Sequence, residues 1–234
     1  CLIQRNLKAS RAIAFDLAAA CSGFLYGLSV ADLYVRSGTC RKALVVGTEV
    51  MSSVVDWTDR GTCILFGDGA GAVLIEPSDD DRGILSTHLH SDGDLWDLVC
   101  VPGGGSRLPA SAAMLADRQQ FVKMKGNETF KVAVRTLEAT AREALEANKM
   151  AVDDVDLFIP HQANVRIVNA VMERLGLRKE RAFLNIDRYG NTSAASIPLA
   201  LDEAVRAGRV SPGSRILMVA FGSGLTWASA VVKW

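Results

Sequence analysis

The sequence is short of several features that would place a protein in a specialised class. Its 234 residues contain no run of about eighteen apolar residues, which a membrane-spanning helix requires, and no signal-peptide pattern opens it. Lysine plus arginine and aspartate plus glutamate both number 26, so no excess of basic charge indicates a nucleic-acid surface. We therefore expect neither a membrane nor a nucleic acid as a partner.

Cysteine and histidine are also scarce. The five cysteines lie at positions 1, 21, 40, 63 and 100, and no two have C-x-x-C spacing. An odd number without that spacing argues against a disulfide framework or a zinc site, so we expect a cytoplasmic protein that holds no metal. His88 and His90 lack a third ligand close by in the sequence, and we interpret them as polar side chains on a strand.

The composition that is present, 49% hydrophobic and 22% charged, is typical of a globular protein with a sizeable core. A weak internal duplication runs through it. The first copy comprises a strand at 13–17, a helix at 24–35, a strand at 43–46, a loop at 67–71 and a strand at 72–75. The second comprises a strand at 183–186, a helix at 195–207, a strand at 216–219, a loop at 222–224 and a strand at 228–232. Strands that alternate with helices predict an α/β fold of two similar halves.

The boundary between the halves is predicted near Gly83, so residues 1–83 carry Cys21 and residues 84–234 carry His161 and Asn191. Cys21 and Asn191 take equivalent positions, each at the start of a helix. Far fewer residues precede Cys21 in the first half than precede Asn191 in the second. We therefore expect the first half to lack its amino-terminal part; the alternative is a first sheet that is simply smaller.

Cys21 lies where a predicted strand gives way to a predicted helix. Ile13, Phe15 and Leu17 alternate with smaller or polar residues, and the helical spacing that follows ends at Gly38. At the first turn of a helix, unpaired N–H groups and the helix dipole lower the pKa of a thiol. We therefore interpret Cys21 as a reactive nucleophile; the alternative is a buried, inert cysteine.

His161 and Asn191 extend this chemistry. His161 follows the predicted strand 157–159 and Pro160, at a carboxyl strand end, where α/β proteins place their sites. Asn191 is flanked by small residues, which suits a group that must be approached closely, although an N-cap role is the alternative. Cysteine, histidine and asparagine together serve papain-like proteases and condensing enzymes. The papain signature C-G-[SA]-C-[WY] is absent, and decarboxylative condensation needs hydrogen-bond donors near a developing oxyanion.

Six motifs in order resemble β-ketoacyl-acyl-carrier-protein synthase III, the initiating condensing enzyme of bacterial-type fatty acid synthesis. They lie at residues 19–24, 58–62, 66–72, 160–164, 190–196 and 221–227. The resemblance implies the thiolase fold, two pseudo-symmetric α/β halves layered α-β-α-β-α, with the first half incomplete. It also implies an acyltransferase that condenses an acyl-CoA, typically acetyl-CoA, with malonyl-acyl-carrier protein, and that needs no cofactor beyond its CoA thioester substrate. Other thiolase-fold enzymes of secondary metabolism, and an inactive fragment, stay open as alternatives.

The resemblance assigns roles residue by residue. It implies that Cys21 carries the acyl group, that His161 and Asn191 stabilise the enolate left by decarboxylation, and that backbone N–H groups of Cys21 and Ser223 hold the oxyanion. Family members often have glycine at the position of Ser223. The remaining assignments are Phe221 beside the reaction centre, Arg60, Asn164 and Arg166 for CoA, and Lys131 with Arg166 for docking acyl carrier protein. The family is usually dimeric, so we expect a homodimer.

Two helices of the second half bear on these assignments. Apolar spacing predicts a helix over 126–148, whose other face carries Lys131 and further cations. That face is either a solvated surface or the docking surface that the resemblance implies. A second helix follows residue 164 and is predicted to end at Gly176.

Overall fold

Eight strands and eight α-helices build the structure, a computed structural model that describes residues 1–234. The strands are β1 (Ala43–Val50), β2 (Asp68–Ile75), β3 (Gly83–Ser91), β4 (Val99–Cys100), β5 (Lys123–Met124), β6 (Leu157–Pro160), β7 (Arg215–Gly222) and β8 (Thr226–Lys233). The α-helices are α1 (Leu2–Asn6), α2 (Gly23–Arg36), α3 (Arg60–Cys63), α4 (Ala112–Ala116), α5 (Gly126–Ala147), α6 (Val165–Leu175), α7 (Ile186–Tyr189) and α8 (Ser196–Arg206). The 3-10 helices are η1 (Ala20–Ser22), η2 (Met51–Ser53), η3 (Gly93–Leu98), η4 (Val152–Asp154), η5 (Lys179–Arg181) and η6 (Ser193–Ala195).

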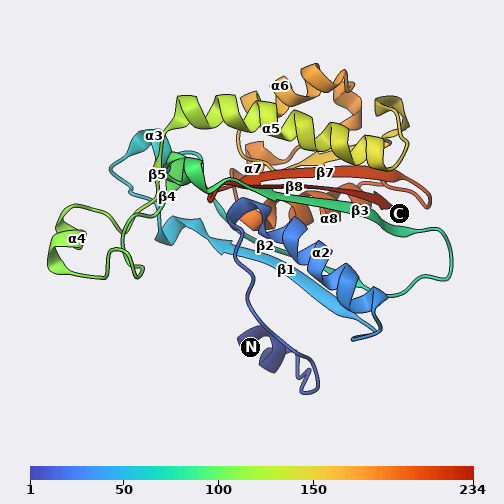
Figure 1. Cartoon of the computed structure of the whole chain (residues 1–234), viewed down its shortest axis with the longest axis horizontal. Coiled ribbons are helices and arrows are strands. Elements are labelled where there is room, and N and C mark those ends of the chain that lie inside the picture. Colours follow the sequence, from blue (N-terminus) through green and yellow to red (C-terminus); the bar gives the residue numbers. More distant parts are fainter.

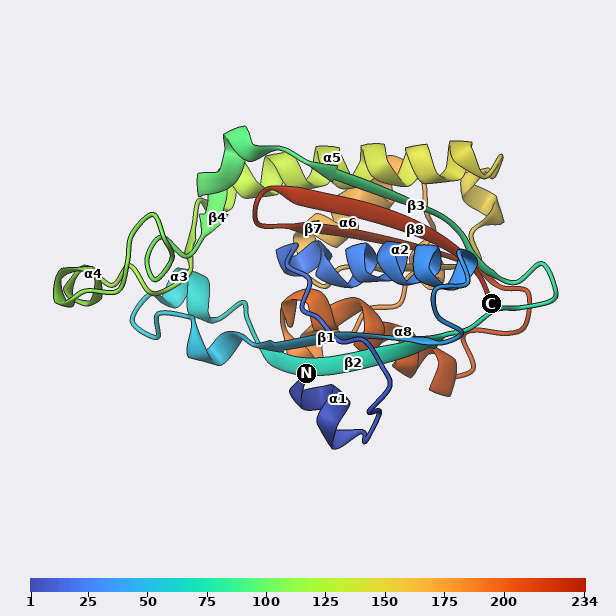
Figure 2. The same ribbon diagram turned by 60° about the horizontal axis from the view of Figure 1, so that its bottom comes forward.

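The elements stack in layers (Figures 1 and 2). A four-stranded sheet has the order β3-β8-β7-β6, in which only the β6–β7 pair is parallel. Helices α5 and α6 cover one face of this sheet, and α2 and α8 lie between its other face and the antiparallel pair β1–β2. The structure therefore alternates helical and sheet layers, as the expected thiolase fold does.

Strands β6 and β7 of the larger sheet are buried on both faces, so their sequences are nearly continuous apolar runs. In β7, Leu217 and Val219 belong to a core shared with α5 and α6, whereas Ile216 and Met218 belong to a core shared with α2 and α8. Val45 of β1 joins the second core. Residues on both sides of the predicted boundary near Gly83 thus share one core, while the division itself stays a prediction.

The outer face of the small sheet is open. Leu44 of β1 and Leu74 of β2 are 47% and 58% exposed, because no long helix packs on that side. The longest helix in the structure, α5, is amphipathic, and no helix is both long and apolar enough to cross a membrane.

Several predicted elements are confirmed. Helix α5 matches the helix predicted over 126–148 and buries Val134, Leu137 and Ala141 against the sheet. Helix α6 ends at Gly176, whose φ of 72° places it in the left-handed region that glycine adopts without strain. Helix α2 likewise ends just before Gly38, at φ 74°.

The strand predicted at 13–17 is wrong. Residues 12–19 form no helix or strand, and none from 13 to 18 makes a backbone–backbone hydrogen bond. Ile13 and Phe15 are 74% and 58% exposed. The alternation of their side chains is real, but a strand also needs a neighbouring strand to complete its hydrogen-bond ladder, and none lies beside this segment.

Two further local predictions are corrected. The strand predicted at 183–186 is reduced to one bridge, between Phe158 and Ala182, and the chain then turns into α7. The loop predicted at 67–71 is mostly strand, because β2 begins at Asp68. Its glycines sit on a strand that packs closely on α8: a Cβ at Gly71 would lie 2.9 Å from the backbone nitrogen of Leu199.

Candidate active site

Cys21 lies in a strained turn that leads into a helix. The turn η1 begins at Ala20, whose φ of 46° is in the left-handed region that non-glycine residues avoid. Helix α2 follows at once, so the prediction that Cys21 lies at or just before the first helical turn is confirmed. Such strain persists only where surrounding contacts hold the backbone in place.

The turn between β7 and β8 supplies those contacts. Thr226 Oγ1 donates to the carbonyl of Ala19 at 2.8 Å, and Ser22 Oγ donates to the carbonyl of Thr226 at 3.1 Å. Gly222, the last residue of β7, approaches so closely that a Cβ there would lie 2.8 Å from the nitrogen of Cys21. The end of β7 and the start of β8 therefore fix the backbone of the nucleophile.

The prediction of a lowered pKa for Cys21 is wrong. Burial raises the pKa of this thiol to about 11, and the carboxylate of Glu49 raises it further. A hydrogen bond from the Ser193 side chain and one from the backbone of Cys21 itself act in the opposite direction. Removal of water from the thiolate outweighs the donors at the start of the helix, so the thiol is protonated at neutral pH and must lose its proton during any acyl transfer.

His161 follows β6 as predicted and is only 3% exposed. Its Nδ1 lies 2.6 Å from Ser196 Oγ, which also accepts the N–H of Gln162 at 3.3 Å. The hydrogen bonds of Ser196 Oγ offer its proton no acceptor other than Nδ1, so we assign the proton of the neutral ring to Nε2. Nε2 has no partner in the protein, and burial lowers the pKa of His161 to about 4. The ring is therefore neutral and can donate from Nε2.

Asn191 is held by residues of the other half. Its N–H donates to the carbonyl of Leu65 at 2.8 Å, and its carbonyl accepts the N–H of Gly67 at 3.0 Å. The segments that contain Gly67 and Asn191 can approach this closely only with glycine at position 67, because a Cβ there would lie 2.1 Å from the carbonyl oxygen of Tyr189. The side-chain oxygen of Asn191 accepts the N–H of Ser193 at 2.8 Å, which leaves the amide NH₂ free to donate.

The two helix starts have the same backbone geometry, but their residues correspond in a different register from the one predicted from the sequence. The turn η6 begins at Ser193 with φ 50°, as η1 begins at Ala20 with φ 46°. Cys21 therefore corresponds to Ala194, and the predicted equivalence with Asn191 is displaced by three residues. The two turns pack together: a Cβ at Gly23 would lie 3.6 Å from the Cβ of Ala194.

Backbone donors are available beside the nucleophile. Neither the N–H of Cys21 nor that of Ser223 donates to a backbone or side-chain acceptor elsewhere in the protein. Ser223 directly follows β7, and its hydroxyl donates to the carbonyl of Val99 in β4. The serine side chain thus anchors this turn, while Phe221, two residues earlier, is 7% exposed.

The residues assigned to CoA and carrier protein lie on the surface. Arg60 opens α3 and is exposed, and Asn164 caps α6 by accepting the N–H of Arg166 at 2.9 Å. The guanidinium of Arg166 lies 5.5 Å from the ring centroid of Phe130 on α5. Lys131, the next residue, is exposed. The starts of α5 and α6 therefore bring Lys131 and Arg166 to neighbouring positions.

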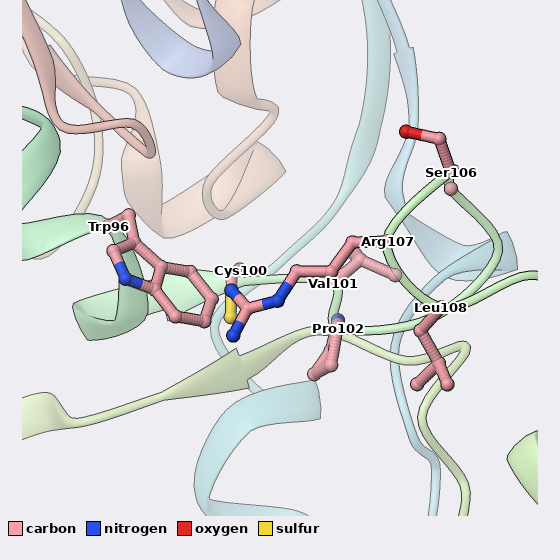
Figure 3. Close-up of a pocket in the computed structure, with 8 residues that line it drawn as sticks. Trp96, Cys100, Val101, Pro102, Ser106, Arg107 and Leu108 are labelled. Atoms are coloured by element: carbon pink, nitrogen blue, oxygen red, sulfur yellow. The ribbon is translucent and has the colours of Figure 1, made fainter.

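Sequence reasoning missed a surface cavity of about 540 Å³ at η3, β4 and the segment after them (Figure 3). Arg107 lies over the ring of Trp96, with 4.4 Å between the guanidinium carbon and the ring centroid. The cavity is also lined by Cys100, Val101, Pro102, Gly105, Ser106 and Leu108. None of the three predicted catalytic residues lines it.

Three polar residues around the reactive groups were not predicted from the sequence: Glu49, Ser193 and Ser196. The two serines belong to the motif at 190–196, in which only Asn191 has a predicted catalytic role, and no sequence pattern distinguishes Glu49. His88 and His90 lie in β3 and contact Glu143 at 3.5 and 2.7 Å. No group of three or more histidine, cysteine, aspartate or glutamate residues is arranged to hold a metal ion.

The structure alternates α and β layers, and it links a thiol, an imidazole and a carboxamide to two packed helix starts. These features define the class of protein: a condensing enzyme of the thiolase fold. Comparisons with known proteins agree. Family models described as 3-oxoacyl-[acyl-carrier-protein] synthase III, and as its C-terminal part, match residues 15–93 and 145–234. The chain belongs to the 3-oxoacyl-[acyl-carrier-protein] synthase III family.

Relatives support this membership along the whole chain. The chain is 52% identical over 234 residues to the β-ketoacyl-[acyl-carrier-protein] synthase III of Roseiflexus castenholzii, covering 100% of the chain and 71% of that protein. The crystal structure of 3-oxoacyl-[acyl-carrier-protein] synthase III from Aquifex aeolicus is 48% identical and matches with a TM-score of 0.91, again over 100% and 71%. The priming β-ketosynthase of the R1128 polyketide pathway is 38% identical with a TM-score of 0.90, over 99% and 69%.

Proposed function

We propose that this protein transfers an acyl group from acyl-CoA, with acetyl-CoA as the typical donor, to Cys21 and condenses it with malonyl-acyl-carrier protein. The product is a 3-oxoacyl-acyl-carrier protein, and the step initiates fatty acid biosynthesis. One observation carries the assignment of roles: the buried, neutral ring of His161 presents an unpartnered Nε2–H. A neutral donor suits an enolate oxyanion and is a poor base for a thiol.

The reaction divides between the two helix starts. Cys21 attacks the acyl-CoA carbonyl, and the free N–H groups of Cys21 and Ser223 stabilise the tetrahedral oxyanion. His161 Nε2–H and the Asn191 amide then donate to the malonyl thioester oxygen as CO₂ leaves. The resulting enolate carbon attacks the Cys21 thioester and releases the sulfur. No metal or redox cofactor takes part in this scheme, and Phe221 closes the side of the site near β7.

Charged and polar residues at the surface supply the partner contacts. Arg60, Asn164 and Arg166 bind CoA, for which a guanidinium beside phosphate is well suited. Lys131 and Arg166 form a basic pair that docks the acidic acyl carrier protein, and this attraction weakens with salt. We further propose a homodimer, as in the family that the sequence resembles, and a cytoplasmic location, which five free cysteines favour.

Intact-protein mass spectrometry after incubation with acetyl-CoA tests the first step. The parent chain is expected to gain one acetyl group, and Cys21→Ala none, with Cys100→Ala as a matched control that keeps the adduct. A folded parent that gains no acetyl group contradicts the proposal. If an adduct forms but malonyl-acyl-carrier protein gives no 3-oxoacyl product, the second candidate holds: a condensing enzyme of secondary metabolism, which the 38% identity to a polyketide priming synthase favours.

A further inference from the structure

The hydrogen-bond ladder beside β6 stops at a proline. The N–H of Phe183 donates to the carbonyl of Phe158 at 3.0 Å, next to the parallel bridge between Phe158 and Ala182. In a regular parallel ladder, the N–H of residue 160 would then donate to the carbonyl of Phe183. Pro160 has no N–H, so this bond cannot form. The carbonyl of Phe183 therefore needs a different donor.

The side chain of Gln162 supplies that donor. Gln162 is 1% exposed, and its Nε2 donates to the carbonyl of Pro160 at 2.7 Å and to that of Phe183 at 3.4 Å. Its Oε1 accepts the N–H of Asn185 at 3.2 Å, whereas a regular ladder would join Asn185 directly to Pro160. The carboxamide is therefore inserted between the two segments, and only this orientation of the amide satisfies all three contacts.

The inserted side chain connects Gln162 to the segment that carries Asn191. Asn185 is 2% exposed, and its carbonyl accepts the N–H of Tyr189, the last residue of α7, at 3.3 Å. Asn191 follows Tyr189 by two residues. The position of Asn191 therefore depends on Gln162 through α7, and on its backbone bonds to residues 65–67 from the other side.

The backbone of Gln162 connects it to His161. The N–H of Gln162 donates to Ser196 Oγ at 3.3 Å, and Nδ1 of His161 lies 2.6 Å from the same oxygen. The N–H of His161 donates to the carbonyl of Val219 at 2.7 Å, which holds this end of the loop on β7. Gln162 thus contacts the segments that carry both proposed donors of the condensation step.

We propose that Gln162 is a positioning residue that sets the distance between His161 and Asn191. The inference rests on the proposed function, because these two side chains are the donors to the malonyl thioester oxygen in that scheme. Gln162 itself touches no reacting atom. Without its carboxamide, the carbonyl of Pro160 and the N–H of Asn185 would lose their partner, and the start of α7 would shift to find new ones.

Gln162→Met is the first test. Methionine fills a similar space but cannot make the three hydrogen bonds. Acetylation of Cys21 is expected to keep the parent rate, because it does not use the two donors. Reaction of the acetyl-enzyme with saturating malonyl-acyl-carrier protein is expected to slow by about 10²-fold, the usual cost of a small misplacement of reacting groups. Intact mass and chromatography of the 3-oxoacyl product measure the two rates.

Thr140→Val is the control for a general loss of stability. Thr140 is buried on α5, and its Oγ1 donates to Ser229 Oγ in β8 at 3.1 Å. Removing this bond leaves a buried hydroxyl without a partner, so the urea midpoint is expected to fall. The ratio of condensation rate to acetylation rate is expected to stay at the parent value, whereas Gln162→Met lowers this ratio.

Gln162→Glu offers a rescue that depends on pH. A protonated carboxyl can donate to the carbonyl of Pro160 and accept from the N–H of Asn185, whereas an ionised carboxylate can only accept. Burial raises the pKa of such a carboxyl. The ratio of condensation to acetylation, relative to the parent at the same pH, is expected to increase from about pH 9 to about pH 6.

The outcomes separate the two proposals. A folded parent that gives no acetyl adduct, or no 3-oxoacyl product, overturns the proposed function and the positioning role with it. If Gln162→Met slows both steps equally, or slows neither, the positioning role alone is overturned. If Gln162→Met shows no cooperative urea transition, Gln162→Glu decides, and a ratio that does not change with pH overturns the positioning role.

Discussion

The two helix starts of this protein use the same backbone for opposite chemistry. Ala20 and Ser193 each hold a left-handed φ, each opens a 3-10 turn, and a long helix follows each. In the proposed reaction, the first supplies the thiol that must lose a proton. The second follows Asn191 and holds His161 through Ser196, and these two residues are the proposed donors for the oxyanion. The backbone geometry places a reactive group at the start of a helix, whereas the neighbouring side chains determine whether that group acts as a nucleophile or as a hydrogen-bond donor.

Removing the proposed hydrogen-bond donors His161 and Asn191 is expected to have the largest effect on the difference between the two helix starts. His161→Ala and Asn191→Ala are each expected to keep acetylation of Cys21 and to lose condensation by about 10²–10³-fold, the usual cost of one oxyanion donor. Mass spectrometry of the acyl-enzyme and chromatography of the 3-oxoacyl product measure the two steps separately. If His161→Ala abolished acetylation as completely as Cys21→Ala, the division of roles would be wrong.

Gly67→Ala tests how the backbone just before β2 positions Asn191. The new Cβ would meet the Tyr189 carbonyl at 2.1 Å, so either the backbone of Asn191 or that of β2 must move. We expect a loss of about 1–3 kcal/mol in the free energy of unfolding, as for other overpacked sites, with condensation reduced more than acetylation. Urea denaturation and the two activity assays provide the measurements. Gly93→Ala is the control, since a Cβ there meets nothing within 4 Å.

The buried ring of His161 should make stability depend on pH. Its pKa falls from 6.5 in the unfolded chain to about 4 in the folded protein. The unfolded chain therefore binds the extra proton first, and stability present above pH 6.5 is lost as pH falls toward 4, by at most roughly 3 kcal/mol. Urea unfolding at pH 7 and pH 5 is the measurement. His161→Gln should lose less stability over this interval than the parent; an equal loss would assign the effect to other groups.

The smallest expected effect concerns the strained residue itself. Ala20→Gly should stabilise the folded protein by about 0.5–1 kcal/mol, because glycine adopts the left-handed φ without steric cost but is more flexible when unfolded. Ala194→Gly, one residue beyond the equivalent position and at an ordinary φ, should destabilise instead. Urea midpoints of the two variants compare the helix starts directly. Destabilisation by Ala20→Gly would mean that the Ala20 methyl contributes more than its strain costs.

Local sequence patterns were sufficient to predict the elements whose conformation is determined within one segment of the chain. The apolar face of α5, the glycine stops of α2 and α6, and the run that forms β7 all follow from spacing and from the burial it requires. The residue types at 21, 161 and 191 likewise indicated thiol, imidazole and carboxamide chemistry. Each of these features depends on nearby residues alone.

Contacts between distant segments decided the rest. The alternation at 13–17 could not form a strand without a neighbour, and the pKa of Cys21 rose because packing removes water from the thiol. The ring proton of His161 depends on Ser196, and Asn191 depends on Gly67, which lies in the other half. Glu49 meets Ser193 across 144 positions of sequence. The sequence by itself determined which reactive groups the protein has. Only the tertiary structure decided their protonation and their partners, because both depend on burial and on hydrogen bonds that folding alone brings together.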